Sequence, residues 1–490
     1  MYEKNDLVTV NITDMGNEGE GIGKLDSFPF FIKDAIIGDT VEAKVLKVKK
    51  NYAFARLEKI IEASDDRIEA PCPVARPCGG CQIQAMSYES QLRFKENKVK
   101  NNLIRIGGVD ASYLNEIFEP IMGMEKPWRY RNKAQYPVSV DKNGNIVAGF
   151  YAGRTHSVIA CTDCLIGSAK NKPILETLIS WMQENRIRPY DEETGEGVVR
   201  HILIKEGFAT GEIMVVLVVN KSVADVPAYR DGGKGIYDKL VKALLTVDVN
   251  SVHKAADKVP GKICSIQLNE NKEKTNVILG KRCALLYGKE YIEDTLMGHN
   301  FRISPLSFYQ VNPHQTKKLY STAIEFADLK GDEEVWDICC GIGTITLSLA
   351  DNLKANADKN GVKCGCVHGL EIVPQAIDNA KDNAVRNKIE NVDFVCAAAE
   401  EYMPANRNHI HADVIVTDPP RKGMDEKSLE VMVSMAPEKI VYVSCDSATL
   451  ARDVKYLTQH GYELKRVRAC DMFSHSVHVE SVVLITRKEK

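Results

Sequence analysis

The stretch EEVWDICCGIGTITLSLA, residues Glu333–Ala350, decides the fold. An apolar run ends at Asp337, a turn follows with Gly341 and Gly343, and apolar residues then recur every three to four positions. In nucleotide-binding α/β units such glycines let the backbone approach the ligand, and the helix that follows presents free N–H groups. The stretch therefore predicts a Rossmann-like unit that binds a cofactor.

Three further strands support this interpretation. CVHGLEIV carries Glu371, a carboxylate placed to hold the hydroxyls of a ribose, VDFVCAAAEEY is similar to an adenine-contacting turn, and ADVIVTDPPRKGM carries Asp418 and Arg421. Nicotinamide enzymes normally have the loop G-x-G-x-x-G, whereas this loop reads G-I-G-T-I-T and lacks the third glycine. The order of glycine loop, acidic strand end and D-P-P turn is similar to that of S-adenosylmethionine-dependent methyltransferases.

The D-P-P turn and one cysteine indicate the methyl acceptor. Methyltransferases that act on amino groups typically have an aromatic residue after D-P-P, and this chain has Arg421 there. A carbon acceptor such as C5 of uracil is too weak a nucleophile, so a thiolate must first add to C6. The stretch VYVSCDSATLARD, Val441–Asp453, places Cys445 at a strand end that faces the ligand crevice. Positive charge from Arg421 would help to ionise that thiol.

These segments resemble the RNA (uracil-5-)-methyltransferases, in DPPRKG, in YVSCD..TLARD, in DMFSHSVHVESVVLI and in the upstream FRISPLSFYQVNPHQTKKLY. The resemblance implies that Cys445 is the nucleophile and that Glu480 is the base that removes the C5 proton. The expected cofactor contacts are Gln310, Cys339, Gly341, Thr344, Glu371 and Asp418. The family often has an aromatic residue at the position of Cys339 and an asparagine near Thr344.

Residues 1–62 show short alternating strands separated by glycine-bearing turns, which favours a small closed β-barrel. EGEGIGK, GDTVEAKV and KKNYAFA resemble a TRAM domain, an OB-like RNA-binding barrel. Lysines beside aromatic residues would then supply phosphate contacts and stacking faces. A solvated lysine edge that blocks strand pairing is the alternative. These residues are Lys44, Lys47, Lys49, Lys50, Tyr52 and Phe54.

Cysteines gather in two loops. Cys72, Cys78 and Cys81 have the spacing C-x5-C-x2-C in a loop rich in proline and glycine, and VIACTDCLIG adds Cys161 and Cys164. Four thiolates suit zinc as well as an iron-sulfur cluster, and spacing does not separate the two. PCPVARPCGGCQIQ resembles the cluster segment of the 23S rRNA (uracil-5-)-methyltransferases. This implies a [4Fe-4S] cluster on Cys72, Cys78, Cys81 and Cys164, with Cys161 the less expected ligand.

Composition limits the remaining possibilities. A chain of 490 residues predicts two to four domains at about 100 to 200 residues each. The sequence has no apolar run of about 18 residues and no apolar segment at its start, so we expect a cytoplasmic protein without a membrane role. Its fourteen cysteines are then better explained as ligands, catalytic groups or core residues than as disulfides. A net charge of -3 means that RNA must be recognised by local patches.

The predicted fold is multidomain α/β. Residues 1–62 form the TRAM barrel, residues 63–292 a central α+β domain with the cysteine-bound cluster, and residues 293–490 a Rossmann-like catalytic domain on which the helix at 88–107 packs. The resemblance implies a monomer that methylates C5 of a uridine in 23S rRNA through a Cys445–C6 adduct. A tRNA target is disfavoured, because tRNA-directed relatives usually lack the barrel and the cysteine cluster. An inactive RNA-binding or redox-sensing protein is the third possibility.

Overall fold

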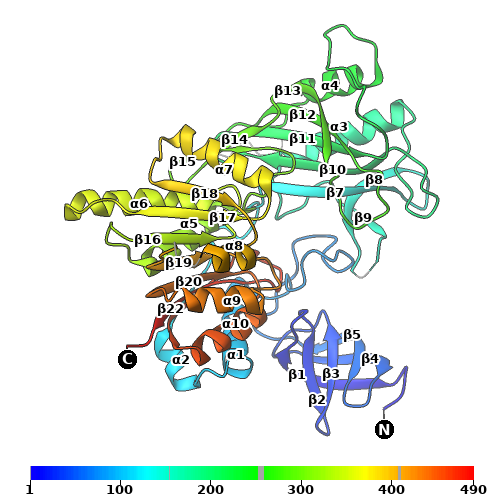
Figure 1. Ribbon diagram of the computed structural model, residues 1–490. Helices are drawn as coiled ribbons and strands as arrows, with labels where there is room; N and C mark the ends of the chain where they lie inside the picture. The colour runs from blue at the N-terminus through cyan, green and yellow to red at the C-terminus, as the bar shows by residue number, and fades with distance from the viewer. Residues whose placement is uncertain (1, 154, 252–258, 407–409, 490) are drawn as a thin grey trace.

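The computed structural model describes residues 2–153, 155–251, 259–406 and 410–489. The chain folds into three sheet-based bodies: a small barrel, a central sheet and a large catalytic sheet (Figure 1). A two-stranded hairpin, β14 (Ile292–Leu296) with β15 (His299–Ile303), begins where the sequence predicts the catalytic domain to begin. None of the described helices is long and apolar enough to cross a membrane.

The N-terminal region is a closed five-stranded barrel, as predicted. Its strand order is β1-β2-β3-β5-β4, and β1 pairs with β4 to close it. Alternate residues of β1, namely Val8, Val10 and Ile12, point into the barrel. There they join a core of valine, isoleucine, alanine and phenylalanine side chains. The strands are β1 (Leu7–Met15), β2 (Gly21–Leu25), β3 (Phe28–Lys33), β4 (Thr40–Val48) and β5 (Ala53–Glu62).

The central body is a seven-stranded sheet in the order β13-β12-β11-β10-β7-β8-β9. Strands β10 and β11 are buried along almost their whole length, and helices α3 and α4 share a core cluster with their apolar residues. The elements are β7 (Lys133–Val140), β8 (Ile146–Tyr151), β9 (Val158–Ala160), α3 (Asn171–Glu184), β10 (Val199–Glu206), β11 (Glu212–Val219), α4 (Ile236–Thr246), β12 (Lys262–Glu270) and β13 (Arg282–Gly288).

The catalytic body is an eight-stranded sheet in the order β18-β17-β16-β19-β20-β22-β21-β6. Strands β16 to β20 run parallel, while β22 lies antiparallel between β20 and β21. Helices α5, α6 and α7 share one core cluster with the sheet, and α8, α9 and α10 share another. The strands are β16 (Glu334–Ile338), β17 (Cys366–Glu371), β18 (Val392–Cys396), β19 (Val414–Thr417), β20 (Lys439–Ser444), β21 (Tyr462–Cys470) and β22 (Glu480–Arg487). The helices are α5 (Pro313–Ala327), α6 (Thr344–Asn360), α7 (Pro374–Asn387), α8 (Ala399–Asn406), α9 (Glu426–Ser434) and α10 (Ser447–Gln459).

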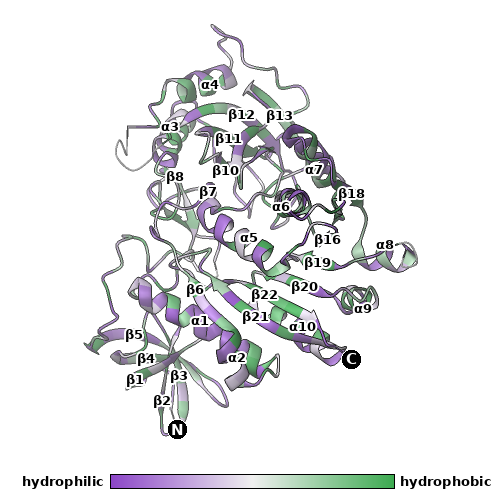
Figure 2. Ribbon diagram, turned by 90° about the vertical axis from the view of Figure 1, so that its left-hand side faces the viewer, coloured by the Kyte–Doolittle hydropathy of each residue, from purple (hydrophilic) through white to green (hydrophobic). Residues whose placement is uncertain are grey.

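An early segment of the chain packs on this C-terminal sheet. It comprises α1 (Tyr88–Arg105), α2 (Ala111–Ile117) and β6 (Phe118–Met122), which Figure 2 shows alongside β21 and α10. Apolar Val99 and Leu103 of α1 join the core cluster of α10, and Asn102 Nδ2 donates a hydrogen bond of 2.8 Å to Ser447 Oγ. Strand β6 pairs in parallel with β21 and forms the sheet edge. Sequence analysis did not predict this eighth strand.

The barrel contacts the other bodies through the end of β1 and the loops that follow β1 and β3. Barrel residues Met15 and Ile36 share a small core cluster with Ile83, which follows the cysteine loop, and with Val477, which precedes Glu480. Barrel and catalytic sheet therefore meet close to the candidate active site.

Candidate active site

The glycine turn after β16 has the backbone of a cofactor-binding loop. Cys339, Gly341 and Gly343 have φ angles of 69°, 57° and 83°, and Gly343 caps the N-terminus of α6. A Cβ atom on Gly343 would lie 3.4 Å from the Phe394 ring, an ordinary contact, so it is the backbone conformation that favours glycine at this position. A non-glycine residue at positive φ is uncommon, and at Cys339 it reverses the chain directly at the strand end.

Three carboxylates lie at the carboxyl ends of adjacent strands. Burial raises the pKa of Asp337 to about 7, with repulsion from Asp418 and Glu371 adding to the effect. Burial also raises the pKa of Asp418 to about 6, although Gln310 Nε2 donates a hydrogen bond of 3.4 Å to this carboxylate. Glu371 accepts a 3.1 Å hydrogen bond from the Gly341 N–H. Such a concentration of negative charge suits a ligand that carries a positive charge.

The remaining predicted cofactor residues lie near the same carboxyl ends of the strands. Gln310 precedes α5 and is buried. Thr344 begins α6, and its hydroxyl lies 3.0 Å from the Tyr320 hydroxyl. Burial raises the pKa of the Cys339 thiol to about 12, and Glu371 and Asp337 contribute further, which places that thiol beside the carboxylates. The six predicted cofactor residues are thus brought together around one turn.

Cys445 and Glu480 lie at the same end of neighbouring strands. In the antiparallel register of β20 and β22, Ser444 pairs with Ser481, so the residues just beyond this pair, Cys445 and Glu480, are neighbours. Cys445 is half-buried and Glu480 is buried. Burial raises the pKa of Glu480 to about 8, Asp418 adds to that shift and Arg421 opposes it. A carboxyl group with that pKa can take up and release a proton near neutral pH.

The sequence predicted that Arg421 helps to ionise Cys445, and the structure shows that its effect is outweighed. Burial raises the pKa of the Cys445 thiol to about 12; the charges of Glu480 and Asp418 raise it further, and Arg421 lowers it by less. The guanidinium lies 3.4 Å from the His478 ring and is exposed. In the free protein the thiol is therefore protonated at neutral pH.

Comparison with known proteins identifies this arrangement. A family model described as tRNA (Uracil-5-)-methyltransferase matches residues 249–488, and a TRAM domain model matches residues 3–57. An "Uncharacterized RNA methyltransferase" from Clostridium tetani is 44% identical over 485 residues, which cover 99% of this chain and 97% of the relative. A second from Halalkalibacterium halodurans is 45% identical over 486 residues, covering 99% and 98%. The chain belongs to the RNA (uracil-5-)-methyltransferase family.

A solved structure shows the same fold in another member of the methyltransferases. The Pyrococcus abyssi tRNA (uracil-54, C5)-methyltransferase in complex with S-adenosyl-L-homocysteine matches with a TM-score of 0.73, covering 98% of this chain and 99% of that chain at 24% identity. The present enzyme uses S-adenosylmethionine, as predicted. Because a tRNA-directed enzyme shares the architecture over its full length, the overall fold does not distinguish an rRNA target from a tRNA target.

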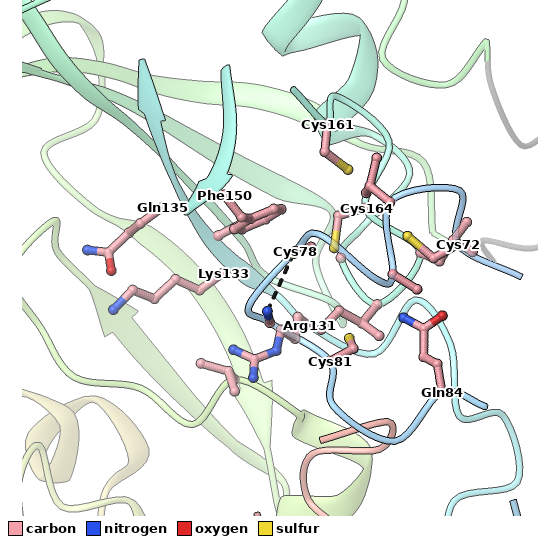
Figure 3. A pocket seen from close by; sticks show the side chains of 18 residues that line it. Cys72, Cys78, Cys81, Gln84, Arg131, Lys133, Gln135, Phe150, Cys161 and Cys164 are labelled. Atoms are coloured by element: carbon pink, nitrogen blue, oxygen red, sulfur yellow. Dashed lines mark hydrogen bonds between the residues drawn. The ribbon is translucent and has the colours of Figure 1, made fainter. Parts of the chain in front are cut away.

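The clustered cysteines of the enzyme line one cavity of about 310 Å³. Cys72, Cys78, Cys81, Cys161 and Cys164 all face it, and Figure 3 shows Arg131 and Lys133 across from them. Burial raises the pKa of Cys81 to about 12, and the neighbouring thiols of Cys164 and Cys78 add to the shift. Within the described ranges, no three His, Cys, Asp or Glu side chains are arranged to hold a metal ion. The structure thus gathers the four predicted ligands and Cys161 at one cavity.

The barrel of the enzyme presents aromatic rings beside lysines. Phe31, Tyr52 and Phe54 form one group with ring centroids 5.4 to 5.8 Å apart, and each ring is half-buried. The neighbouring residues Lys47, Lys49 and Lys50 are exposed, while Lys44 is half-buried. This surface can offer both ring faces and positive charge to RNA.

Sequence analysis missed a buried polar network next to Glu480. It joins three side chains of α1, namely Gln91, Lys95 and Lys98, to the loop Asp471–Val479 that ends directly before Glu480. Their spacing of four and three residues is the available sequence signal, because such residues lie on one face of a helix. Nothing in the local sequence indicates their partners, which lie more than 370 residues further along the chain.

Proposed function

We propose that this methyltransferase transfers a methyl group to C5 of uridine through a covalent bond between Cys445 Sγ and C6 of the base. The observation that carries the proposal is the pairing of β20 with β22, which sets a thiol and a carboxyl of raised pKa at one strand end beside the cofactor turn. The presence of both groups argues against a protein that has kept the fold and lost activity.

The proposed reaction balances in two stages. Cys445 loses its proton to water and its sulfur adds to C6, so that electron density moves to C5 and makes that carbon nucleophilic. Bound S-adenosylmethionine supplies an electrophilic methyl group, which C5 takes. Glu480 then removes the C5 proton, the Sγ–C6 bond breaks, and its electron pair returns to the sulfur. The bond from the methyl group to the sulfonium sulfur breaks with its electron pair left on that sulfur, so the products are 5-methyluridine, S-adenosylhomocysteine and the regenerated cysteine.

We further propose a uridine of 23S rRNA as the target. Support comes from the cysteine segment, whose sequence resembles that of the 23S rRNA enzymes. The four cysteines expected to bind the cluster also line one cavity. Extruding a paired or stacked uridine costs a few kcal/mol, which contacts of the barrel with neighbouring nucleotides would offset. The test is nucleotide-resolution mapping of 5-methyluridine in total RNA from strains with and without the gene. Loss of 5-methyluridine from 23S rRNA is expected in the deletion strain.

A uridine of tRNA is the second candidate. It is favoured by the description of the family model that matches residues 249–488 and by the tRNA substrate named for the Pyrococcus abyssi structure. The same mapping experiment decides between the two. If 5-methyluridine disappears from tRNA and persists in 23S rRNA, the rRNA proposal is wrong.

We also propose that Cys72, Cys78, Cys81 and Cys164 hold a [4Fe-4S] cluster. Support comes from the resemblance of PCPVARPCGGCQIQ to a cluster segment and from the four thiols lining one cavity of about 310 Å³; four thiolates would also suit zinc. Such a cluster supplies a rigid tie between the two cysteine loops. Iron and sulfide analysis of anaerobically purified enzyme tests it, and zinc in place of iron would contradict it.

Location and assembly complete the proposal. An RNA substrate and fourteen cysteines that are all free in the structure suit the reducing cytoplasm. We propose a monomer, because the residues of the catalytic site come from one chain. Light scattering of the purified enzyme tests this, and a stable dimer would contradict it.

A further inference from the structure

The loop that leads to the catalytic base is buried, which is unusual for a connection between strands. Strand β21 ends at Cys470 and β22 begins at Glu480, and these two residues pair across the sheet. Of the nine residues between them, Asp471 to Val479, only Phe473 and His478 are not buried. His475 also has a φ of 65°, a strained conformation that persists only where the surroundings enforce it.

An ion pair inside the protein anchors the beginning of this loop. Lys95 Nζ of α1 lies 2.5 Å from Asp471 Oδ1, and both side chains are fully buried. The same ammonium donates a hydrogen bond of 2.9 Å to the Phe473 carbonyl. The second oxygen of Asp471 accepts a 2.8 Å hydrogen bond from the Tyr88 hydroxyl, which in turn accepts one from the Met124 N–H.

Helix α1 holds two more points of the loop from the same face. Gln91 lies one turn before Lys95; its Oε1 accepts from the His475 N–H at 2.9 Å and its Nε2 lies 3.1 Å from the His475 ring nitrogen. Lys98 lies one turn after Lys95 and donates to the Val477 carbonyl at 3.0 Å. On the other side of the loop, the Trp128 ring stacks on His475 at 3.6 Å.

Stability alone does not explain this arrangement. Moving both charges of an ion pair out of water costs about as much as their attraction returns, and apolar side chains of the same size are often at least as stabilising. What charged and hydrogen-bonded partners add over apolar ones is a fixed geometry. Here the part held in a fixed geometry is a nine-residue loop, and the residue directly after it is Glu480, the proposed base.

We propose that Lys95 is a positioning residue for Glu480, which it holds in place through Asp471 and the loop that Gln91 and Lys98 also fasten. This inference rests on the proposed covalent mechanism. A displacement of about 1 Å at a reacting group can slow a step about a hundredfold. The step affected is the one that Glu480 serves, removal of the C5 proton with release of Cys445, whereas formation of the adduct and methyl transfer precede it.

The experiment follows the methylated covalent intermediate in the full-length enzyme. Variants are incubated with radiolabelled S-adenosylmethionine and with rRNA and tRNA from a strain that lacks the gene. Denaturing gels measure the protein-RNA adduct, and nucleoside analysis measures released 5-methyluridine. Lys95→Met should increase the adduct about tenfold or more and slow release by about ten- to a hundredfold. Glu480→Gln, which removes the base, should accumulate the same adduct.

Matched variants separate positioning from folding. Lys100→Met removes another lysine of α1, which pairs with Glu96 at 2.9 Å near the surface, and should release product at the wild-type rate. Lys95→Met combined with Asp471→Asn leaves no unpaired buried charge, and should fold, bind S-adenosylmethionine normally and still accumulate adduct.

Each other outcome has a distinct meaning. Normal release by the double variant would overturn the inference, and so would a parallel loss of folding, cofactor affinity and adduct formation, which would assign the pair to stability only. Absence of adduct in Glu480→Gln would instead contradict the covalent mechanism on which the inference depends.

Discussion

At the residue scale, burial sets the protonation of Cys445 and Glu480, the two groups proposed to perform the chemistry. The pKa of Cys445 is raised to about 12 and that of Glu480 to about 8, mainly because both side chains are withdrawn from water beside Asp418. Sequence motifs singled out both residues, and their roles as nucleophile and base remain the proposal made above. They did not predict the pKa values, because these depend on depth and on charges that three different strand ends contribute.

The rate of 5-methyluridine formation should rise as the pH increases from 6 to 9. Glu480 acts as a base only when deprotonated, and its pKa is about 8, while the thiolate of Cys445 becomes more abundant throughout this range. Steady-state turnover with saturating RNA measures the profile. A rate that is constant or falls between pH 7 and pH 9 would contradict these protonation states.

Glu480→Gln should stabilise the ligand-free protein at high pH. The folded-state pKa is raised from 4.5 to about 8, so the folded protein binds more protons than the unfolded chain between these values. The contribution is fully present below pH 4.5 and is lost as the pH rises through 8. Glutamine does not ionise, and the free energy of unfolding at pH 9 should exceed that of the wild type by on the order of 5 kcal/mol. Urea unfolding at pH 5 and pH 9 measures the difference, which should nearly vanish at pH 5.

At the element scale, the strand ends could be predicted from the sequence, but not all of their neighbours. The apolar run before Asp337 and the glycines after it identify a strand, a turn and a helix within eighteen residues. Strand β6 is different, since its five residues include a proline and pair with β21, about 350 residues away. No local pattern encodes a pairing of that range. The hydrogen-bond partners of the polar face of α1 could not be predicted for the same reason, because they are equally distant in the sequence.

Gly343→Ala should weaken binding of S-adenosylmethionine. The alanine must adopt a φ of 83° at the start of α6, a backbone conformation that strains any residue with a Cβ atom, so the turn is destabilised. The strain costs about 1 to 2 kcal/mol. Calorimetric titration with S-adenosylmethionine measures the affinity. Gly108→Ala is the control, because Gly108 has a φ of 71° and open space around it away from the site. Equal affinity loss in both variants would contradict the assignment of the turn.

At the scale of the whole molecule, the sequence predicted the barrel and the catalytic fold, and of the contacts among the bodies it predicted only the packing of the helix at 88–107 on the catalytic domain. The barrel and the catalytic fold could be read from strand spacing and motifs that each lie within one segment. The cysteine cavity is lined by two loops about 80 residues apart in the sequence. The barrel residues Met15 and Ile36 share a core cluster with both Ile83 and Val477. Such contacts depend on how separate bodies dock, which periodicity does not record.

Cys164→Ser should remove iron from the purified enzyme, whereas Cys161→Ser should retain it. Both thiols line the same cavity three residues apart, so the pair is a matched test of which one is a ligand. Iron and sulfide content and the visible absorption of anaerobic protein measure the result. If Cys161→Ser alone lost its iron, Cys161 would be the ligand and the assignment of Cys164 would be wrong.

The central claim is that Cys445 bonds to C6 of the target uridine, and trapping that bond tests it most directly. RNA that contains 5-fluorouridine has fluorine where the C5 proton would be removed, so the adduct does not proceed to release. Mass spectrometry of the digested complex should find a nucleotide that carries the transferred methyl group, attached to the peptide with Cys445. Cys445→Ala should bind S-adenosylmethionine and form no such complex. A stable adduct on another residue, or methylation by Cys445→Ala at the wild-type rate, would contradict the account.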